Sequence, residues 1–184
     1  MIETIEILKQ KLNEEKNNKG DWKSVYRELL QEIYKQPVLF FALSRSEFKK
    51  ERKSSTPLIS TKDFGGAPSL YVFSDIEFAA SWMRYYKRVI EDIKYGLIGA
   101  VRKEENDFLQ IFSIAKHMNV QYIMLDEGGA YVGISIDDFL EANQINTHSV
   151  QIQFSKEEME QILENKKQPT LKFNEVFLIP LTRS

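Results

Sequence analysis

The chain has 184 residues and a net charge of −2, from 25 Lys and Arg against 27 Asp and Glu. This length indicates one domain, and a hydrophobic content of 42% is enough to form a core. The near-neutral charge gives no general attraction to nucleic acid or to an anionic membrane, so we expect neither as a partner. The absence of cysteine excludes disulfides, Cys-ligated zinc, iron–sulfur clusters and thiol nucleophiles.

The first residues of the chain lack the basic and apolar regions of a signal peptide. The longest apolar run, residues 37–43, is too short to span a bilayer. The lack of cysteine fits a reducing or an oxidising compartment and does not decide between them. We therefore expect a cytoplasmic protein.

Two helices and a strand are predicted at the start of the chain. Apolar residues at helical spacing predict an amphipathic helix over 2–17, with the stripe Ile2, Ile5, Leu8 and Leu12. Asp21 is a suitable N-cap for a second helix over 22–35, which Pro37 ends. The apolar run that follows predicts a core strand at 38–43.

A strand and a capped helix form the centre of the chain. Residues 70–73 are rich in β-branched and aromatic side chains, which predicts a strand. Ser74 to Glu77 have the pattern of a capping box. In such a box the Ser74 hydroxyl accepts from the Glu77 amide, and the Glu77 side chain reaches back to the Ser74 amide. The box predicts a helix over 75–93.

The other expected elements alternate between strand and helix. Before the central strand we expect a short strand at 58–61 and a turn at 63–68. After the central helix we expect a strand at 97–101, a helix at 105–118, a hairpin over 121–134 closed by Gly128 and Gly129, and a short helix capped by Ser135. The tail predicts a strand at 150–154, a helix to 165 and an edge strand at 173–180. This order predicts an α+β fold, a mixed β-sheet with helices packed against it.

Three parts of this pattern occur together between residues 22 and 143. They are residues 26–30 leading to 38–41, residues 70–79 with Trp82, and residues 114–115 followed by 123–129. Together they resemble the SseB N-terminal domain family (enhanced serine sensitivity proteins) of bacteria, although that family tends to have Asn-Pro where this chain has Asp126-Glu127. The resemblance implies a compact α/β-type domain and no established catalytic residues. It leaves 1–20 as an N-terminal helical extension, 21–143 as the domain, and 145–184 as a strand–helix–strand extension of the same globule.

Several short motifs suggest chemistry, but each has a simpler structural explanation. Residues 63–65 spell the kinase metal-binding triplet Asp-Phe-Gly, yet the phosphate loop and catalytic loop of a kinase are missing, which favours a turn. Asp126 and Glu127 could hold a cation, but too few acids follow for a calcium loop. We therefore expect a hairpin turn whose acidic side chains keep it soluble.

The histidines and one further acidic pair also point to structural roles. His117 and His148 are far apart in sequence, and a histidine metal site needs two or three converging ligands. Asp137 and Asp138 would point about 100° apart on a helix, and they suit its first turn. We expect no bound metal and no cofactor.

The helix over 75–93 and the segment before it provide a candidate interaction surface. Apolar residues cover more than half of this helix, so some aromatic surface is expected to stay exposed beside its arginines, a combination that binding sites favour. The segment 44–56 is the most basic part of the chain. The candidate protein-binding residues are Arg45, Lys49, Lys50, Arg52, Lys53, Arg84, Tyr85 and Arg88.

Two classes of function follow from these observations. The missing chemistry and the many aromatic residues favour a non-catalytic protein-interaction module, either an adaptor or an immunity-type protein. The alternative is a small-molecule-binding domain or small hydrolase that uses carboxylates and hydroxyls in a cleft at the strand carboxyl ends. A deep pocket with converging polar groups would favour the alternative, and an exposed aromatic patch would favour the interaction module. The sequence leaves enzymatic activity open.

Overall fold

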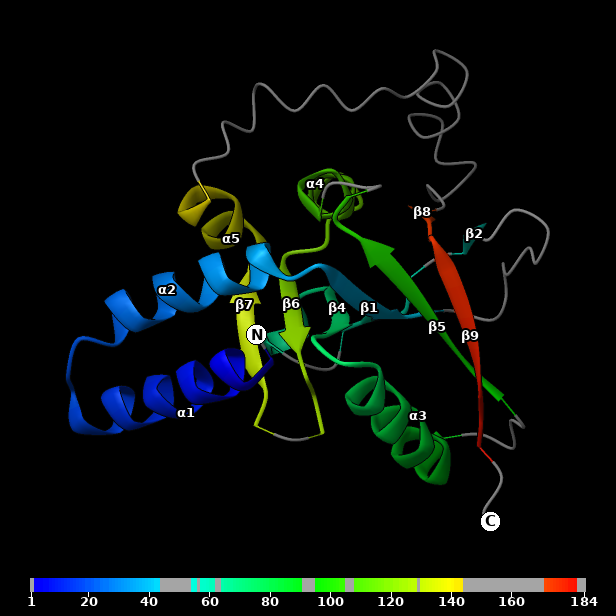
Figure 1. Ribbon diagram of the computed structural model, residues 1–184, viewed down its shortest axis with the longest axis horizontal. Helices are drawn as coiled ribbons and strands as arrows, with labels where there is room; N and C mark the ends of the chain where they lie inside the picture. The colour runs from blue at the N-terminus through cyan, green and yellow to red at the C-terminus, as the bar shows by residue number, and fades with distance from the viewer. Residues whose placement is uncertain are drawn as a thin grey trace.

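A mixed β-sheet with helices against it forms the centre of the molecule, as the sequence predicts (Figure 1). This is a computed structural model, and its fold is α+β. It describes residues 2–43, 54–55, 57–61, 64–90, 95–104, 108–128, 130–143 and 171–181. The predicted strand at 150–154 and the helix to 165 lie outside the described residues.

The helices begin and end within a few residues of their predicted positions. They are α1 (Ile2–Asn18), α2 (Trp22–Lys35), α3 (Ile76–Ile90), α4 (Phe108–His117) and α5 (Ile136–Ala142), with a 3₁₀ turn η2 (Phe64–Gly66). The strands are β1 (Val38–Ala42), β2 (Ser54–Ser55), β3 (Ile59–Ser60), β4 (Ser69–Phe73), β5 (Tyr95–Arg102), β6 (Tyr122–Leu125), β7 (Val132–Ser135), β8 (Leu171–Lys172) and β9 (Glu175–Pro180). The turn η2 contains the Asp-Phe-Gly glycine, so the expectation of a turn there is confirmed.

The main sheet has the strand order β7-β6-β4-β1-β5-β9, and β3 also pairs with β4. Its parallel pair is β4 with β6, and its other pairs are antiparallel. The hairpin of β6 and β7 and the edge position of β9 confirm two predictions. A separate pair joins β2 to β8. The sheet therefore places the carboxyl ends of β4 and β6 side by side.

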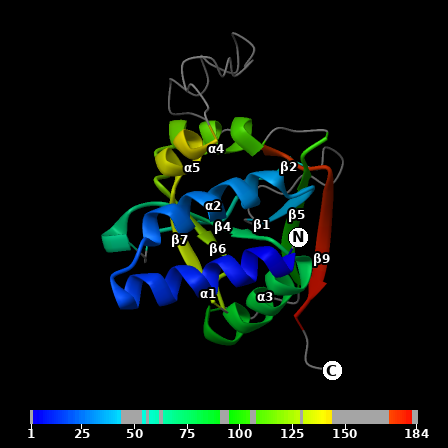
Figure 2. The same ribbon diagram turned by 60° about the vertical axis from the view of Figure 1, so that its left-hand side comes forward.

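Helices cover both faces of the sheet. Strand residues alternate between the faces: Leu39 and Phe41 of β1 belong to the larger core with α1, α2, α4 and α5, whereas Ala42 belongs to the smaller core with α3. Figure 2 shows α1 and α2 lying side by side along the sheet. Phe173, just before β9, is buried over Gly99 so closely that a Cβ at Gly99 would lie 2.4 Å from its ring.

Local signals account for most of the element ends. The Asp21 side chain accepts from the Ser24 amide at the start of α2, and the Ser135 side chain accepts from the Asp138 amide at the start of α5. Both predicted caps are therefore confirmed. In the hairpin turn Gly128 has a φ of 100°, a conformation that glycine adopts at low cost.

The predicted capping box at the start of α3 is wrong. The Ser74 amide donates to Asp126 at 2.7 Å, so it is not available to the Glu77 side chain, and the Ser74 hydroxyl also donates to Asp126, at 2.9 Å. The Asp75 side chain accepts from the Glu77 amide instead, at 2.6 Å. The Glu77 amide thus bonds a neighbouring carboxylate, which accepts a hydrogen bond more strongly than the Ser74 hydroxyl does, while the Ser74 amide bonds the distant Asp126.

None of the helices in the described residues combines the length and apolar character that a membrane span requires.

Candidate functional site

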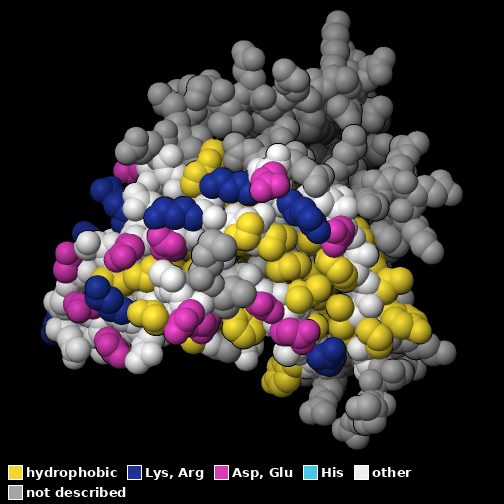
Figure 3. All heavy atoms as spheres, in the orientation of Figure 1, with side chains coloured by type: hydrophobic (Ala, Val, Ile, Leu, Met, Phe, Trp, Pro, Cys, Tyr) yellow, Lys and Arg dark blue, Asp and Glu magenta, His cyan; other side chains and the backbone are white. Residues whose placement is uncertain are grey.

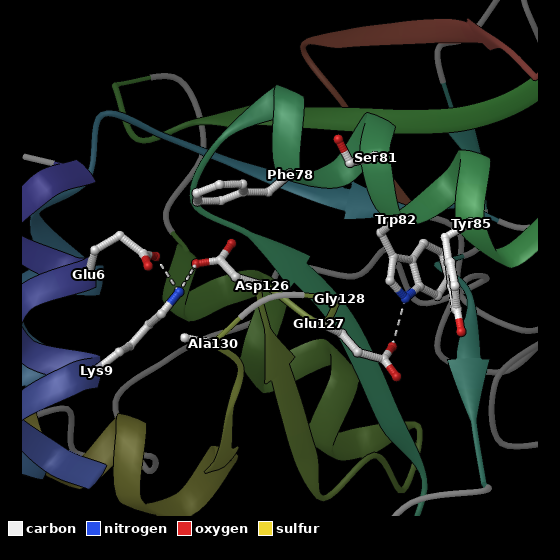
Figure 4. Close-up of a pocket in the computed structure, with 10 residues that line it drawn as sticks. All are labelled: Glu6, Lys9, Phe78, Ser81, Trp82, Tyr85, Asp126, Glu127, Gly128 and Ala130. Carbon is white, nitrogen blue, oxygen red and sulfur yellow. Dashed lines mark hydrogen bonds and ion pairs between the residues drawn. The ribbon is translucent and has the colours of Figure 1, made fainter. Parts of the chain in front are cut away.

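A pocket of about 560 Å³ lies beside the carboxyl ends of β4 and β6. Because these strands are parallel, the start of α3 and the turn of the hairpin meet at the same edge of the sheet. The pocket lies between these two elements and helix α1, which lines its remaining side (Figure 4). The lining residues are Glu6, Lys9, Phe78, Ser81, Trp82, Tyr85, Asp126, Glu127, Gly128 and Ala130.

Asp126, the first residue of the hairpin turn, is the polar centre of this edge. Its side chain is 3% exposed and accepts from the Ser74 amide, the Ser74 hydroxyl and the Lys9 ammonium, the last at 3.0 Å. Its backbone has a φ of 54°, a left-handed conformation that Asp tolerates better than most residues. The expectation of a solvated, solubilising Asp126 is therefore wrong.

Lys9 brings α1 into the same network. Its side chain is 1% exposed, and its ammonium forms ion pairs with Asp126 and with Glu6 one turn earlier in α1. The ring of Phe78 in α3 lies 5.7 Å from the ammonium. A buried lysine would be very costly without such partners. The cluster therefore fixes α1, the hairpin turn and α3 relative to one another.

This cluster is not among the sites that the sequence predicts, although α1 contains one signal of it. Lys9 is four residues after Ile5 and three before Leu12, so it lies within the apolar stripe that predicts the helix. A lysine on the buried face of a helix needs an acidic partner. Nothing in the local sequence indicates that the partner is Asp126, which is 117 residues away.

Aromatic residues of α3 form the wall of the pocket that faces away from Lys9 and Glu6. Phe78, Trp82 and Tyr85 are spaced i, i+4 and i+7, so they share one face of the helix. Trp82 is 4% exposed, and its indole N–H donates to the Glu127 carboxylate at 2.8 Å. Phe78 is 38% exposed and Tyr85 66% exposed. The buried Trp82 therefore lies between two aromatic side chains that solvent can reach.

The pocket is open to solvent along its rim. Half of its lining residues are exposed: Phe78, Ser81, Tyr85, Gly128 and Ala130. Figure 3 shows acidic and basic side chains interspersed over α1 and α2, and hydrophobic side chains gathered toward α3, β5 and β9. Apolar surface is thus available next to the charged helices.

The predicted interaction residues fall into two groups. Arg84 and Tyr85 are exposed on α3, and Tyr85 lines the pocket. The side chain of Arg88 and the basic residues Arg45, Lys49, Lys50, Arg52 and Lys53 lie outside the described residues. Leu43, which precedes the basic segment, donates from its amide to the carbonyl of Leu97 in β5, the strand that follows α3.

The remaining candidate residues lie at helix ends, in the structural roles expected from the sequence. His117 ends α4, and Asp137 and Asp138 lie in the first turn of α5 as predicted. Asp137 pairs with Lys116. Among the described residues, no three His, Asp or Glu side chains converge in a group that could hold a metal ion. His148 lies outside them.

A smaller hollow of about 250 Å³ lies between α2 and α5 and contains Tyr26 and Asp138. The Tyr26 hydroxyl donates to the Asp138 carboxylate at 3.2 Å and accepts from the Ser135 amide at 3.3 Å. Burial raises the pKa of Tyr26 well above its ordinary value, and the negative charge of Asp138 raises it further. The hydroxyl therefore joins the two helices in its neutral form.

Fold and site together define an α+β protein with an open pocket of aromatic and acidic residues at the carboxyl ends of two parallel strands. Comparison of the chain with protein-family models, curated proteins and solved structures finds no match.

Proposed function

We propose that this protein is a non-catalytic protein-interaction module, of the adaptor or immunity type, whose partner contacts the pocket between α1 and α3. The observation that carries this proposal is the aromatic face of α3, where Phe78 and Tyr85 are exposed on either side of Trp82. Tyrosine and tryptophan are enriched among the residues that contribute most to binding between proteins. The open rim leaves room for a partner surface rather than enclosing a ligand.

The hydrolase alternative is weaker because its candidate groups bind one another. Ser74 is 3% exposed, and its hydroxyl donates to Asp126, which is equally buried. A substrate could not reach either group without displacing the Lys9 ion pair. The small-molecule alternative is favoured by the pocket volume, which lies within the roughly 300–1,000 Å³ of ligand sites. It requires a ligand that binds with much of its surface in water.

The proposal also includes three expectations drawn from the sequence: a location, a family and a second contact. A cytoplasmic location, expected from the sequence, remains part of this proposal. Kinship with the SseB N-terminal domain family is supported by the three segments described above, which form α2 with β1, β4 with α3, and α4 with β6. The basic segment 44–56 is proposed as a second contact, one that attracts acidic side chains of the same partner.

Affinity capture from native cytosol tests the proposal. We expect the wild-type protein to retain a defined set of proteins that Tyr85→Ser loses. The matched control is Tyr95→Ser, because Tyr95 is also an exposed tyrosine but does not line the pocket. Equal retention by wild type and Tyr85→Ser would contradict the proposed site.

Charge reversal tests the second contact. Changing Lys49, Lys50, Arg52 and Lys53 to Glu should slow association with a captured protein and alter its salt dependence, while folding stays intact. An unchanged association rate in stopped-flow measurements at low and high salt would exclude this segment from the interface.

A further inference from the structure

We propose that the outer edge of β9, the side that faces away from β5, pairs with the same edge of a second copy of this chain. The two sheets then join into one across a two-fold axis. This contact is separate from the pocket between α1 and α3 and does not depend on the proposed function. It follows from the direction of the backbone groups of β9, from the number of its outward donors and from the side chains that it exposes.

Strand β9 is the last strand of the main sheet on its side. Figure 2 shows β9 outside β5, and among the described residues no strand pairs with its outer edge. Its middle, residues 176–179, consists of four apolar residues in succession. Edge strands are commonly protected from pairing by charged side chains, and this stretch has none. The edge is therefore suited to receive a further strand.

The hydrogen bonds of β5 show which backbone groups of β9 point outward. The Leu97 carbonyl accepts from the amide that follows β1, so Leu97 faces β1 and the next residue, Ile98, faces β9. Ile98 is the partner of Phe177, so the amide and carbonyl of Phe177 are directed at β5. Successive residues of a strand direct these groups to opposite sides. The amides and carbonyls of Val176 and Leu178 therefore point outward.

The outward donors end on both sides of this pair of residues. Pro180, the next outward residue, has no amide hydrogen. Before the strand, the Asn174 amide donates to the Ala100 carbonyl of β5 at 2.9 Å, so it is directed inward. Within β9 the outward donors are therefore the amides of Val176 and Leu178.

An antiparallel second copy centred on Phe177 matches these groups. Val176 of one copy lies opposite Leu178 of the other, and each donates to the carbonyl of the other, so every outward amide of both copies finds an acceptor. In a register centred on Leu178, the Val176 carbonyl would lie opposite Pro180, which has no hydrogen to donate. Because the edge is complementary to itself, we assign a second copy as its occupant, with the two-fold axis at Phe177.

The side chains of the edge fit the same register. Leu178 is 56% exposed, and Val176 of the second copy lies beside it on the same face of the joined sheet. On the other face the two Phe177 side chains lie opposite each other, and aromatic pairs in such positions stabilise a sheet. Figure 3 shows hydrophobic side chains gathered toward β5 and β9. Pairing therefore removes exposed apolar surface as well as satisfying backbone groups.

Sedimentation equilibrium of the purified full chain tests the pairing. A contact along one strand edge is small, so we expect a reversible dimer with a Kd on the order of 100 μM. Leu178→Lys places a charge on the edge and should weaken the dimer at least about tenfold. Ile7→Lys is the matched control, because Ile7 is 58% exposed but lies on α1, and it should leave the Kd unchanged. Both positions are exposed, so the circular dichroism of each variant should match that of wild type.

Single cysteines test the register, because the chain has none of its own. In the proposed register the Cα atoms of the two Phe177 positions are about 4.5 Å apart, a separation that a disulfide spans. Those of the two Leu178 positions are about 7–8 Å apart, which is too far. Phe177→Cys should therefore form a disulfide-linked dimer under mild oxidation faster than Leu178→Cys does.

Three contrary outcomes would overturn the proposal. A wild-type chain that stays monomeric at about ten times the expected Kd has no self-pairing edge. A dimer that Leu178→Lys leaves unchanged uses another surface. Faster disulfide formation by Leu178→Cys than by Phe177→Cys contradicts the register centred on Phe177. Capture of partner proteins by wild type and Tyr85→Ser is a separate measurement, so the interaction module stands or falls independently of these results.

Discussion

The Lys9 ammonium is enclosed by side chains from three separate parts of the chain. Glu6 comes from its own helix, Asp126 from the hairpin turn and Phe78 from α3. Asp126 in turn receives both donors of Ser74. The buried charges of Lys9 and Asp126 therefore depend on each other, and loss of one leaves the other buried without their ion pair.

Lys9→Met tests this dependence. The substitution keeps the volume of the side chain but leaves Asp126 with only its two Ser74 donors. We expect the free energy of unfolding to fall by about 3 kcal/mol in urea denaturation. Lys35→Met removes the exposed pair with Glu32 and should cost under about 0.5 kcal/mol. A similar small loss for both variants would show that the buried pair contributes little.

Tyr26 should make stability depend on pH at the alkaline end. Because burial and Asp138 raise its pKa, the folded chain keeps the Tyr26 proton at pH values where the unfolded chain, with a tyrosine pKa near 10, releases it. The contribution is fully present below about pH 10 and is lost as pH rises through the folded-state pKa. The free energy of unfolding of wild type should therefore fall more steeply above pH 10 than that of Tyr26→Phe. Parallel curves for the two proteins would contradict the raised pKa.

At the scale of elements, α3 shows how a tertiary contact changes a local signal. The sequence indicates that a helix begins after Ser74, and it does, but Asp75 supplies the acceptor for the Glu77 amide. Ser74 is instead committed to Asp126. The start of α3 is therefore fixed by the hairpin turn as well as by its own residues.

Two substitutions distinguish the observed cap from the predicted capping box. Asp75→Ala removes the acceptor of the Glu77 amide and should lower the free energy of unfolding by about 1 kcal/mol. Glu77→Ala should cost under about 0.5 kcal/mol, because the Ser74 amide that its side chain would serve in a box already donates to Asp126. Urea denaturation of both variants checks this, and the opposite order would restore the capping box.

The elements could be predicted from sequence because their signals are local and periodic. The stripe of α1, the cap at Asp21 and the glycine turn at Gly128 each depend on residues within one or two turns of chain. The site could not be predicted in the same way. A turn acid such as Asp126 has the same local sequence whether it faces water or a lysine, and its partner is determined only when α1 packs against the sheet. The composition of α3 predicts its exposed aromatic face, whereas no local pattern predicts the pocket beside it.

At the scale of the whole molecule, both ends of the described chain are integrated into the core. Ile5, Leu8 and Leu12 of α1 are buried in the larger cluster, and Phe173 lies in the same cluster with its ring 6.0 Å from that of Phe41. The sheet is completed at one edge by β9, which follows Phe173. The stability of the middle of the chain therefore depends on both ends.

Phe173→Ala should destabilise the whole protein rather than release β9 alone. Removing a buried phenylalanine leaves a cavity over Gly99 and costs about 3–5 kcal/mol. The thermal transition should shift to lower temperature and stay single by circular dichroism and by tryptophan fluorescence. Phe177→Ala, at a partly buried position of β9, should cost distinctly less. Two separate transitions would show that β9 unfolds independently.

The separation of 117 residues between Lys9 and Asp126 has a consequence for synthesis of the chain. A ribosome adds roughly 5–20 residues per second, so α1 is complete roughly 6–23 seconds before its acidic partner is made. During that interval its apolar stripe can lie against α2 but has no sheet to cover, and Lys9 is solvated on what will become a buried face. Helix α1 therefore leaves the ribosome well before the contact that holds it in place can form, and until then the nascent chain presents an amphipathic surface to the chaperones around the exit tunnel.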